Sequence, residues 1–312
     1  MSPDTFEELV RPFRRELAAH CYRMLGSLQD AEDQVQETLL SAWRGIDGFE
    51  HRSSMRSWLY KIATNRCLDE IRRRPRHGLP SEHGAPRDPL APIEPVGELL
   101  WVEPAAPGMW SDAPPSAEAL YSQRESVQLA FIVALQHLPA TQRAAVILRD
   151  VLGWSAAEVA ELLDTSVAAV NSALQRARAT LEPLRDSTAV TDGDAIAARY
   201  IAAWEAGDID ALVALLHHDV TISMPPVPTW FRGAEAARAL FGPKMTTQPR
   251  RMLRIAGADA LTFASYRRTG DAPYVGYAIQ VLYVRDGKIT EMHAFVDRAL
   301  LPKFGVPATI ER

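Results

Sequence analysis

The chain has 312 residues, 47% of them hydrophobic and 23% charged, and a formal net charge of −5. This length predicts two or three domains, and the acidic balance excludes a protein that is basic throughout, so any contact with nucleic acid has to be local. No apolar run approaches the roughly 20 residues that span a bilayer, and the N-terminus lacks the features of a signal peptide, which favours a cytoplasmic location. Cys21 and Cys67 lack a metal-binding spacing, so we expect core cysteines and neither a metal nor a cofactor.

The first amphipathic element is a helix predicted over 28–43. Its apolar residues recur at helical spacing and form one face, with Asp30 as the expected N-cap. The opposite face presents Asp33, Gln36 and Glu37. Such a face is either a solvated helix surface or a docking site for a basic partner, and the residues alone leave both interpretations open.

A second helix, predicted over 58–74, has a basic face opposite its apolar face. Lys and Arg neutralise phosphates, and Asn pairs with the edge of adenine. The loop that precedes it places basic residues and a methionine among aromatics, which suits an unstacked base. A solvated basic face is the alternative. The candidate nucleic-acid residues of the loop and helix are His51, Arg52, Met55, Arg56, Lys61, Asn65, Asp69, Arg72 and Arg73.

A proline-rich segment separates this helical part from the next. Ten of the 22 prolines fall between Pro75 and Pro115, and acidic residues outnumber basic ones there, which predicts an extended acidic linker. Two tryptophans, Trp101 and Trp110, stand where a free linker would be polar. We interpret them as an interdomain docking element, with an accidental apolar patch as the alternative.

The segment 153–181 has the pattern of a helix-turn-helix. Ser155 and Glu158 form a capping box for its first helix, and Ser166 is the expected N-cap of the second. A recognition helix of this kind turns its N-terminal residues toward base edges in the major groove. The outward residues expected to read bases or contact phosphates are Ala168, Asn171, Ser172, Gln175, Arg176 and Arg178.

The last third of the chain changes pattern and predicts an α+β domain. Two helices, the second over 210–218, precede several strands, and 276–297 reads as a hairpin with Asp286 and Gly287 at a type I′ turn. Each polar or aromatic candidate for a site here is equally well a core or surface residue. These candidates are Trp204, His217, His218, Asp219, Trp230, Tyr277, His293 and Asp297.

The two helical parts carry a specific resemblance. DAEDQVQETLLSAW, followed by RSWLYKIATNRCLDEIRRR, resembles region 2 of the extracytoplasmic-function (ECF) sigma factors of bacterial RNA polymerase, and 126–181 resembles region 4. The resemblance implies core RNA polymerase, through its β and β′ subunits, and promoter DNA as partners. It implies that the acidic face of 28–43 meets the polymerase clamp and that the 51–56 loop captures a −10 base. It also places Asn65, Arg66, Arg72 and Arg73 near the −10 strand and the helix-turn-helix at the −35 element.

The C-terminal third resembles the SnoaL-like, or NTF2-like, fold, a curved sheet wrapped on helices to form a cone with a pocket. The whole chain then resembles ECF sigma factors with a SnoaL-like extension, as in the SigG and SigJ types. Some members of the fold are isomerases with an Asp base and a Tyr donor in an apolar pocket. Trp204, Trp230, Tyr277 and His293 are the candidates for such a pocket here.

The sequence therefore predicts a multidomain protein of two all-α sigma domains followed by an α+β SnoaL-like cone. The expected parts are region 2 at 1–76, the linker at 77–118, region 4 at 119–186 and a regulatory domain at 190–312. We expect a non-catalytic initiation factor that requires no anti-sigma factor. One alternative is a DNA-binding regulator fused to a small-molecule-binding or isomerase-like pocket enzyme, and a second is a repressor that works without polymerase.

Overall fold

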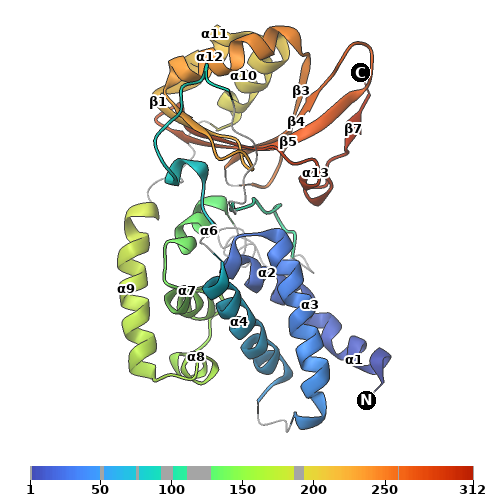
Figure 1. Cartoon of the computed structure of the whole chain (residues 1–312), viewed down its shortest axis with the longest axis vertical. Helices are drawn as coiled ribbons and strands as arrows, with labels where there is room; N and C mark the ends of the chain where they lie inside the picture. The colour runs from blue at the N-terminus through green and yellow to red at the C-terminus, as the bar shows by residue number, and fades with distance from the viewer. Residues whose placement is uncertain are drawn as a thin grey trace. The chain divides into compact units, whose positions relative to one another are not determined.

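The computed structural model describes residues 2–49, 53–74, 77–92, 101–110, 128–185, 193–258 and 260–311. Contacts divide the chain into two compact units. The helical unit comprises Met1–His77 and Trp110–Arg185, and the mixed unit comprises Gly78–Met109 and Asp186–Arg312. The predicted fold class, helical domains followed by an α+β domain, is confirmed (Figure 1).

The first half of the helical unit is a bundle in which α2, α3 and α4 contact one another (Figure 1). Gly26 ends α2 in the left-handed conformation, at φ 78°, and the Ser27 side chain caps α3 by accepting from the Asp30 amide. The predicted N-cap was therefore wrong by one turn, because Asp30 lies inside the first turn. The elements are α1 Pro3–Val10, η1 Arg11–Phe13, α2 Arg14–Leu25, α3 Leu28–Gly45, η2 Ile46–Gly48 and α4 Met55–Arg73.

The second half of the helical unit contains the predicted helix-turn-helix. The capping box of Ser155 and Glu158 is formed, and the Ser166 hydroxyl accepts from the Ala169 amide at the start of the last helix. Val167 is 43% exposed because it lies in the first turn of this helix, beyond the packed stripe. The elements are α6 Leu129–Gln136, α7 Ala140–Val146, the π-helical turn η4 Ile147–Val151, α8 Ala156–Leu162 and α9 Val167–Arg185.

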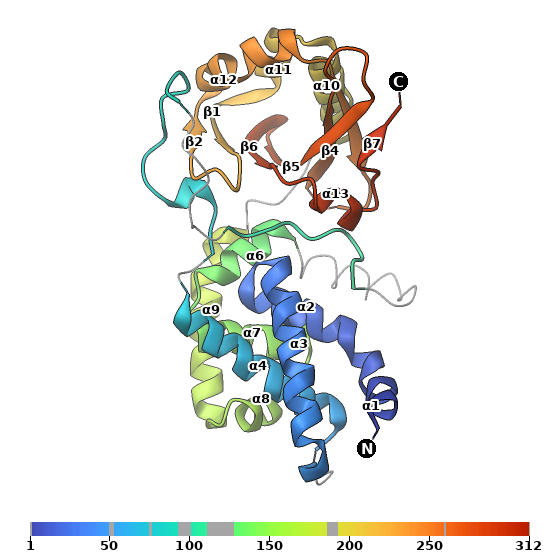
Figure 2. The same cartoon turned by 45° about the vertical axis from the view of Figure 1, so that its right-hand side comes forward.

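The mixed unit is a seven-stranded sheet with the order β2-β1-β6-β5-β4-β3, and β7 pairs with β5. Helices α10, α11 and α12 lie over one face of the sheet (Figure 2), and the core between them includes Tyr200, Phe231 and Phe263. The strands are β1 Leu216–Ser223, β2 Trp230–Arg232, β3 Arg250–Ile255, β4 Leu261–Arg267, β5 Tyr274–Arg285, β6 Lys288–Phe295 and β7 Thr309–Ile310. The helices are η3 Pro80–Glu82, α10 Gly193–Ala206, α11 Ile209–Leu215, α12 Ala234–Thr247 and α13 Leu300–Lys303.

The predicted hairpin is confirmed, and one predicted helix is too long. Asp286 and Gly287 both have positive φ, 51° and 70°, as a type I′ turn between β5 and β6 requires. The helix expected to reach residue 218 ends at Leu215, because Leu216 already pairs with Ile289 of β6. His217 and His218 therefore lie on a strand, and they do not cap a helix.

Asp30 holds the end of α4 against the start of α3. Its carboxylate lies 2.9 Å from Arg74 Nη1 and 3.2 Å from His77 Nε2. The hydrogen bond from His77, with help from Arg74, lowers the pKa of Asp30. A carboxyl group with a lowered pKa stabilises the fold above its unfolded-state pKa, about 3.9, and this contribution disappears as the pH falls through the lower, folded-state value.

We therefore expect Asp30→Asn to lower the free energy of unfolding by about 1 kcal/mol at pH 7, a figure that allows for solvent screening. The difference from the wild type should shrink as the pH falls below 4. Urea unfolding followed by circular dichroism at both pH values measures this. Asp33→Asn, on the exposed face of the same helix, serves as the control, and an equal loss in that variant would contradict the role given to Asp30.

Candidate nucleic-acid and partner interfaces

The acidic face of α3 is exposed along its length. Asp33, Gln36 and Glu37 all lie on the solvent side, and Gln29 Nε2 donates to Asp33 Oδ1 at 3.0 Å. Leu40, one turn further on, is 46% exposed. Leu40 was not among the predicted residues, although its spacing from Gln36 and Glu37 places it on their face. A single exposed apolar residue is common on protein surfaces, so the exposed polar and acidic side chains are the main feature of this face.

The C-terminal half of α4 leaves part of its predicted basic face open. Asn65, Arg72 and Arg73 are exposed, and Arg72 Nη1 pairs with Asp69 Oδ1 at 2.7 Å. Arg66 instead donates to the Ser41 hydroxyl at 2.7 Å. His51 and Arg52, predicted for the preceding loop, lie outside the described residues.

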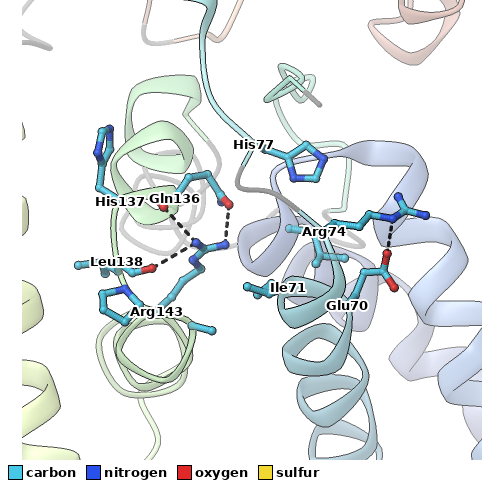
Figure 3. Close-up of a pocket in the computed structure, with 11 residues that line it drawn as sticks. Glu70, Ile71, Arg74, His77, Gln136, His137, Leu138 and Arg143 are labelled. Atoms are coloured by element: carbon cyan, nitrogen blue, oxygen red, sulfur yellow. Dashed lines mark hydrogen bonds and ion pairs between the residues drawn. The ribbon is translucent and has the colours of Figure 1, made fainter. Parts of the chain in front are cut away.

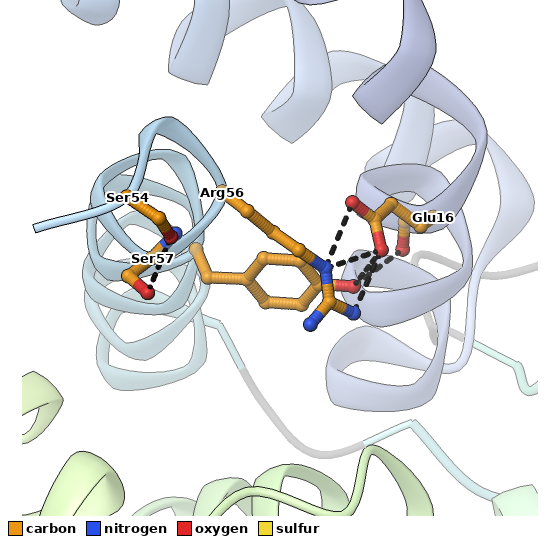
Figure 4. Close-up of polar contacts among 5 residues, drawn as sticks. Glu16, Ser54, Arg56 and Ser57 are labelled. Atoms are coloured by element: carbon orange, nitrogen blue, oxygen red, sulfur yellow. Dashed lines mark hydrogen bonds and ion pairs between the residues drawn. The ribbon is translucent and has the colours of Figure 1, made fainter.

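The N-terminal half of α4 turns its basic residue into the protein. Arg56 donates to both carboxylate oxygens of Glu16 on α2, at distances of 2.8 and 3.1 Å from Nε (Figure 4). Its guanidinium also lies over the rings of Tyr60 and Trp154, at 5.0 and 5.7 Å from their centroids. Met55, next to it, is half-buried. Burial alone would lower the pKa of Arg56, but the hydrogen bonds and charge interactions with Glu16 and Tyr60 together outweigh it and raise that pKa.

Lys61, the next basic residue of α4, reaches the turn of the helix-turn-helix. Its Nζ lies 2.7 Å from Asp164 Oδ1 and 3.4 Å from the carbonyl oxygen of Glu161. Asp164 occupies the turn between α8 and α9 with a positive φ of 50°. A residue predicted to face −10 DNA is thus held by the element predicted to read −35 DNA.

Further contacts join the two halves of the helical unit. Arg143 of α7 is only 3% exposed, and its guanidinium donates to the carbonyl of Met24 at the end of α2. The same side chain donates to Gln136 and Leu138 in its own half (Figure 3). Trp154 packs on Tyr60 with ring centroids 5.3 Å apart. We call the surface where the two halves meet the seam.

The seam also contains a cavity of about 310 Å³. The end of α4 and the following residues line it on one side, and the connection from α6 to α7 lines it on the other (Figure 3). The cavity is partly open to solvent, so it is a cleft at the edge of the seam and not a void inside a core. The labelled residues around the cavity are Glu70, Ile71, Arg74, His77, Gln136, His137, Leu138 and Arg143.

The outward face of α9 is exposed to solvent. Its candidate base-reading residues are all exposed, namely Ala168, Asn171, Ser172, Gln175, Arg176 and Arg178. Arg176 donates to the Ser172 hydroxyl at 2.6 Å, whereas Arg178 pairs with Asp150 at 2.7 Å. Arg176 therefore projects along the predicted base-reading face, and Arg178 braces α9 against η4.

The two linker tryptophans contact different units. Trp101 is 7% exposed, and its indole Nε1 donates to the carbonyl of Pro226 in the mixed unit at 2.8 Å. Trp110 packs on Tyr22 of α2 in the helical unit, with ring centroids 5.0 Å apart. Neither indole projects freely into solvent.

A cavity of about 350 Å³ lies in the mixed unit. Trp204, Tyr277 and His293 border it, but Trp230 does not. Trp230 donates from Nε1 to the carbonyl of Gly84, and its own carbonyl accepts from the Arg87 amide. Its prediction as a pocket residue was wrong, because it lies on the short strand β2, which faces the linker.

The polar candidates of the mixed unit contact near neighbours. The His293 imidazole lies 2.8 Å from the Ser223 hydroxyl and 3.0 Å from the Glu291 carboxylate. Asp219 pairs with Arg232 at the surface, and Asp297 accepts from the Ala299 amide beyond the end of β6. No Asp or Glu is among the described residues that line the cavity.

Two features are absent from the residues that the structure describes. No group of three or more His, Cys, Asp or Glu side chains there is placed to hold a metal ion. None of the helices formed by these residues is both long enough and apolar enough to cross a bilayer.

Comparisons with known proteins agree with this arrangement of parts. Residues 9–77 match Sigma-70 region 2, residues 128–181 match Sigma-70 region 4, and residues 197–292 match the SnoaL-like domain. The ECF RNA polymerase sigma factor SigG of Mycobacterium tuberculosis is 43% identical over 316 residues, which cover 98% of this chain and 85% of SigG.

A second relative carries the same order of domains. SigJ of Mycobacterium tuberculosis is 32% identical over 232 residues, 72% of this chain and 64% of SigJ. The crystal structure of SigJ matches 98% of this chain and 100% of its own at a TM-score of 0.56 and 24% identity, which shows a shared fold. The chain belongs to the ECF RNA polymerase sigma factors and carries a C-terminal SnoaL-like domain.

Proposed function

We propose that this sigma factor docks on the β and β′ subunits of core RNA polymerase through the acidic face of α3, including Leu40. In the same proposal, α4 and the loop before it engage the −10 element, and α9 reads the −35 element. The exposure of Asn65, Arg72 and Arg73 on α4 and of Arg176 on α9 supports this assignment. The site of action would be the cytoplasm, where the polymerase works.

The free factor, in this proposal, is closed and has to open before it reads a promoter. The observation that carries this step is the contact between Lys61 and Asp164, at 2.7 Å. Elements centred at −10 and −35 are about 25 base pairs apart, which is roughly 85 Å along B-DNA. Side chains in contact across the seam cannot serve both elements at once.

Opening the seam should require only a moderate free energy. The pair between Lys61 and Asp164 is partly exposed, with 38% and 72% of the side chains accessible, so it contributes at most about 1 kcal/mol. Arg143 would lose its bond to Met24 but keep its acceptors in its own half. Docking of α3 on the polymerase can supply energy of this order.

The SnoaL-like domain would act as a regulatory module of the same chain. Trp101 is bound by this domain and Trp110 packs on the helical unit. A change in either contact would therefore affect the linker that carries both tryptophans. No Asp or Glu is among the described lining residues of its cavity, so they do not supply the Asp base that isomerases of this fold pair with a Tyr donor, which favours ligand binding. The expectation that no separate anti-sigma factor is required stays a prediction.

Reversal of two charges on α3 tests the polymerase-binding face. The double variant Asp33→Lys with Glu37→Lys should weaken binding to core polymerase at least about tenfold, because like charges then face a basic partner surface. Its thermal stability should hardly change, since exposed helix charges contribute little. Fluorescence anisotropy with labelled factor measures the affinity.

The matched control reverses Asp4 and Glu8, which are exposed with the same spacing on α1. That variant should bind core polymerase like the wild type. Equal affinities in all three proteins would rule out α3 as the docking face.

Single substitutions test the two DNA faces in the reconstituted holoenzyme. Arg176→Ala should weaken binding to the mapped promoter by about 1–3 kcal/mol and relax preference at one −35 position. Arg72→Ala and Arg73→Ala should each reduce the salt dependence of open-complex formation by about one unit of slope. Arg199→Ala, exposed on α10, is the control.

Tight binding of duplex promoter by the free factor would instead support a repressor that works without polymerase.

A further inference from the structure

The cavity of the SnoaL-like domain has a cationic end, and apolar side chains form most of the remaining lining. Arg250, Arg267 and Lys244 are the cations, and no acidic residue is among the described lining residues. We propose that this cavity binds an anionic amphipathic small molecule, with a carboxylate or similar head at the cations and an apolar body against the apolar part of the lining. The proposal does not depend on how the chain contacts polymerase or DNA.

The cationic end is built from three separate elements. Arg250 begins β3, is 7% exposed, and donates from Nη1 to the hydroxyl of Tyr277. The guanidinium of Arg267, from β4, lies 5.3 Å from the centroid of the Tyr277 ring. Burial and the charge of Arg250 lower the pKa of Lys244 on α12, so the cations are close enough to repel one another.

The absence of ion pairs at this end contrasts with the rest of the domain. Among the described residues no carboxylate pairs with Arg250, Arg267 or Lys244. Other arginines on the same domain have carboxylate partners at 2.5–2.8 Å, namely Arg232 with Asp219, Arg238 with Asp210, Arg251 with Glu205 and Arg254 with Asp194. Arg250 is buried, whereas Lys244 and Arg267 are exposed beside it. A cluster of cations without counter-charge is a site for an anion.

A β-bulge aims the hydroxyl of Tyr277 at this end. Ser265 pairs with Ala278 but Tyr266 pairs with Gly276, so Tyr277 is the extra residue in β5. An extra residue reverses the alternation and turns Tyr277 to the same face as Gln280 and Leu282. Burial raises the pKa of Tyr277, so the phenol stays protonated and can donate a hydrogen bond to an anion.

The apolar part of the lining suits an apolar body of moderate size. Aromatic and aliphatic side chains form it, and the volume of about 350 Å³ corresponds to about a dozen water-sized groups at roughly 30 Å³ each. An apolar body of 8–12 carbon atoms is of about this order. The apolar lining includes Trp204, Ile222, Val227, Phe241, Leu282 and Met292.

The test compares acids with their neutral amides on the full-length factor. Isothermal titration calorimetry would measure octanoate against octanamide and 2-naphthoate against 2-naphthamide. We expect the carboxylate to bind at least about tenfold more tightly in one or both pairs, because a charge-assisted hydrogen bond is stronger than a neutral one.

Three variants assign that preference to the cavity. Arg267→Gln and Lys244→Gln should each weaken carboxylate binding about tenfold and leave amide binding unchanged, and neither disturbs the buried Arg250. Arg285→Gln removes an exposed cation at the end of β5, outside the cavity, and should change neither affinity. Equal affinity for acid and amide in both pairs, no binding by either carboxylate, or an equal loss in Arg285→Gln would overturn the proposal.

Discussion

The buried guanidinium of Arg143 is the interaction on which the closed helical unit depends. A guanidinium that is 3% exposed stays charged and needs acceptors for its donors, since an unpaired buried charge costs several kcal/mol. Arg143 takes most acceptors from its own half and one, the Met24 carbonyl, from the other. These hydrogen bonds hold region 4 against region 2, and the two can still separate because only the bond to Met24 has to break.

The other contacts of the seam also join side chains from both halves of the helical unit. Tyr60 and Arg56 provide an aromatic and cationic surface for Trp154, and Lys61 reaches the turn before the recognition helix. In the proposed open form Lys61 would face DNA instead of Asp164. The closed and open forms would then compete for this side chain, and a partner that binds only the open form would shift the population toward it.

Local pattern predicted most of the secondary structure and the family. The capping box at Ser155 and the turn at Asp286 could be predicted because the residues that define each lie within four positions of one another. The N-cap of α3 was missed because Ser27 and Asp30 are both good caps, and the left-handed Gly26 decides between them. The exposure of Leu40 follows from its phase on the helix but not from its residue type.

Contacts between distant segments could not be read from the sequence. Nothing near Lys61 indicates Asp164, 103 residues away, and nothing near Trp230 indicates that its carbonyl meets the linker. The cations of the cavity come from α12, β3 and β4, so no window of sequence contains them together. Tyr277 joins them only because a bulge reverses the parity of its strand.

The distance between the two halves of the helical unit tests the central claim most directly. Cys21 and Cys67 are buried, so spin labels can be placed selectively at Glu8→Cys on α1 and Thr180→Cys on α9, both exposed sites. Pulsed electron paramagnetic resonance should give a single distance for the free factor and a distance longer by tens of ångströms in the holoenzyme on promoter DNA, where the two elements lie roughly 85 Å apart. The same distance in both states would contradict the account.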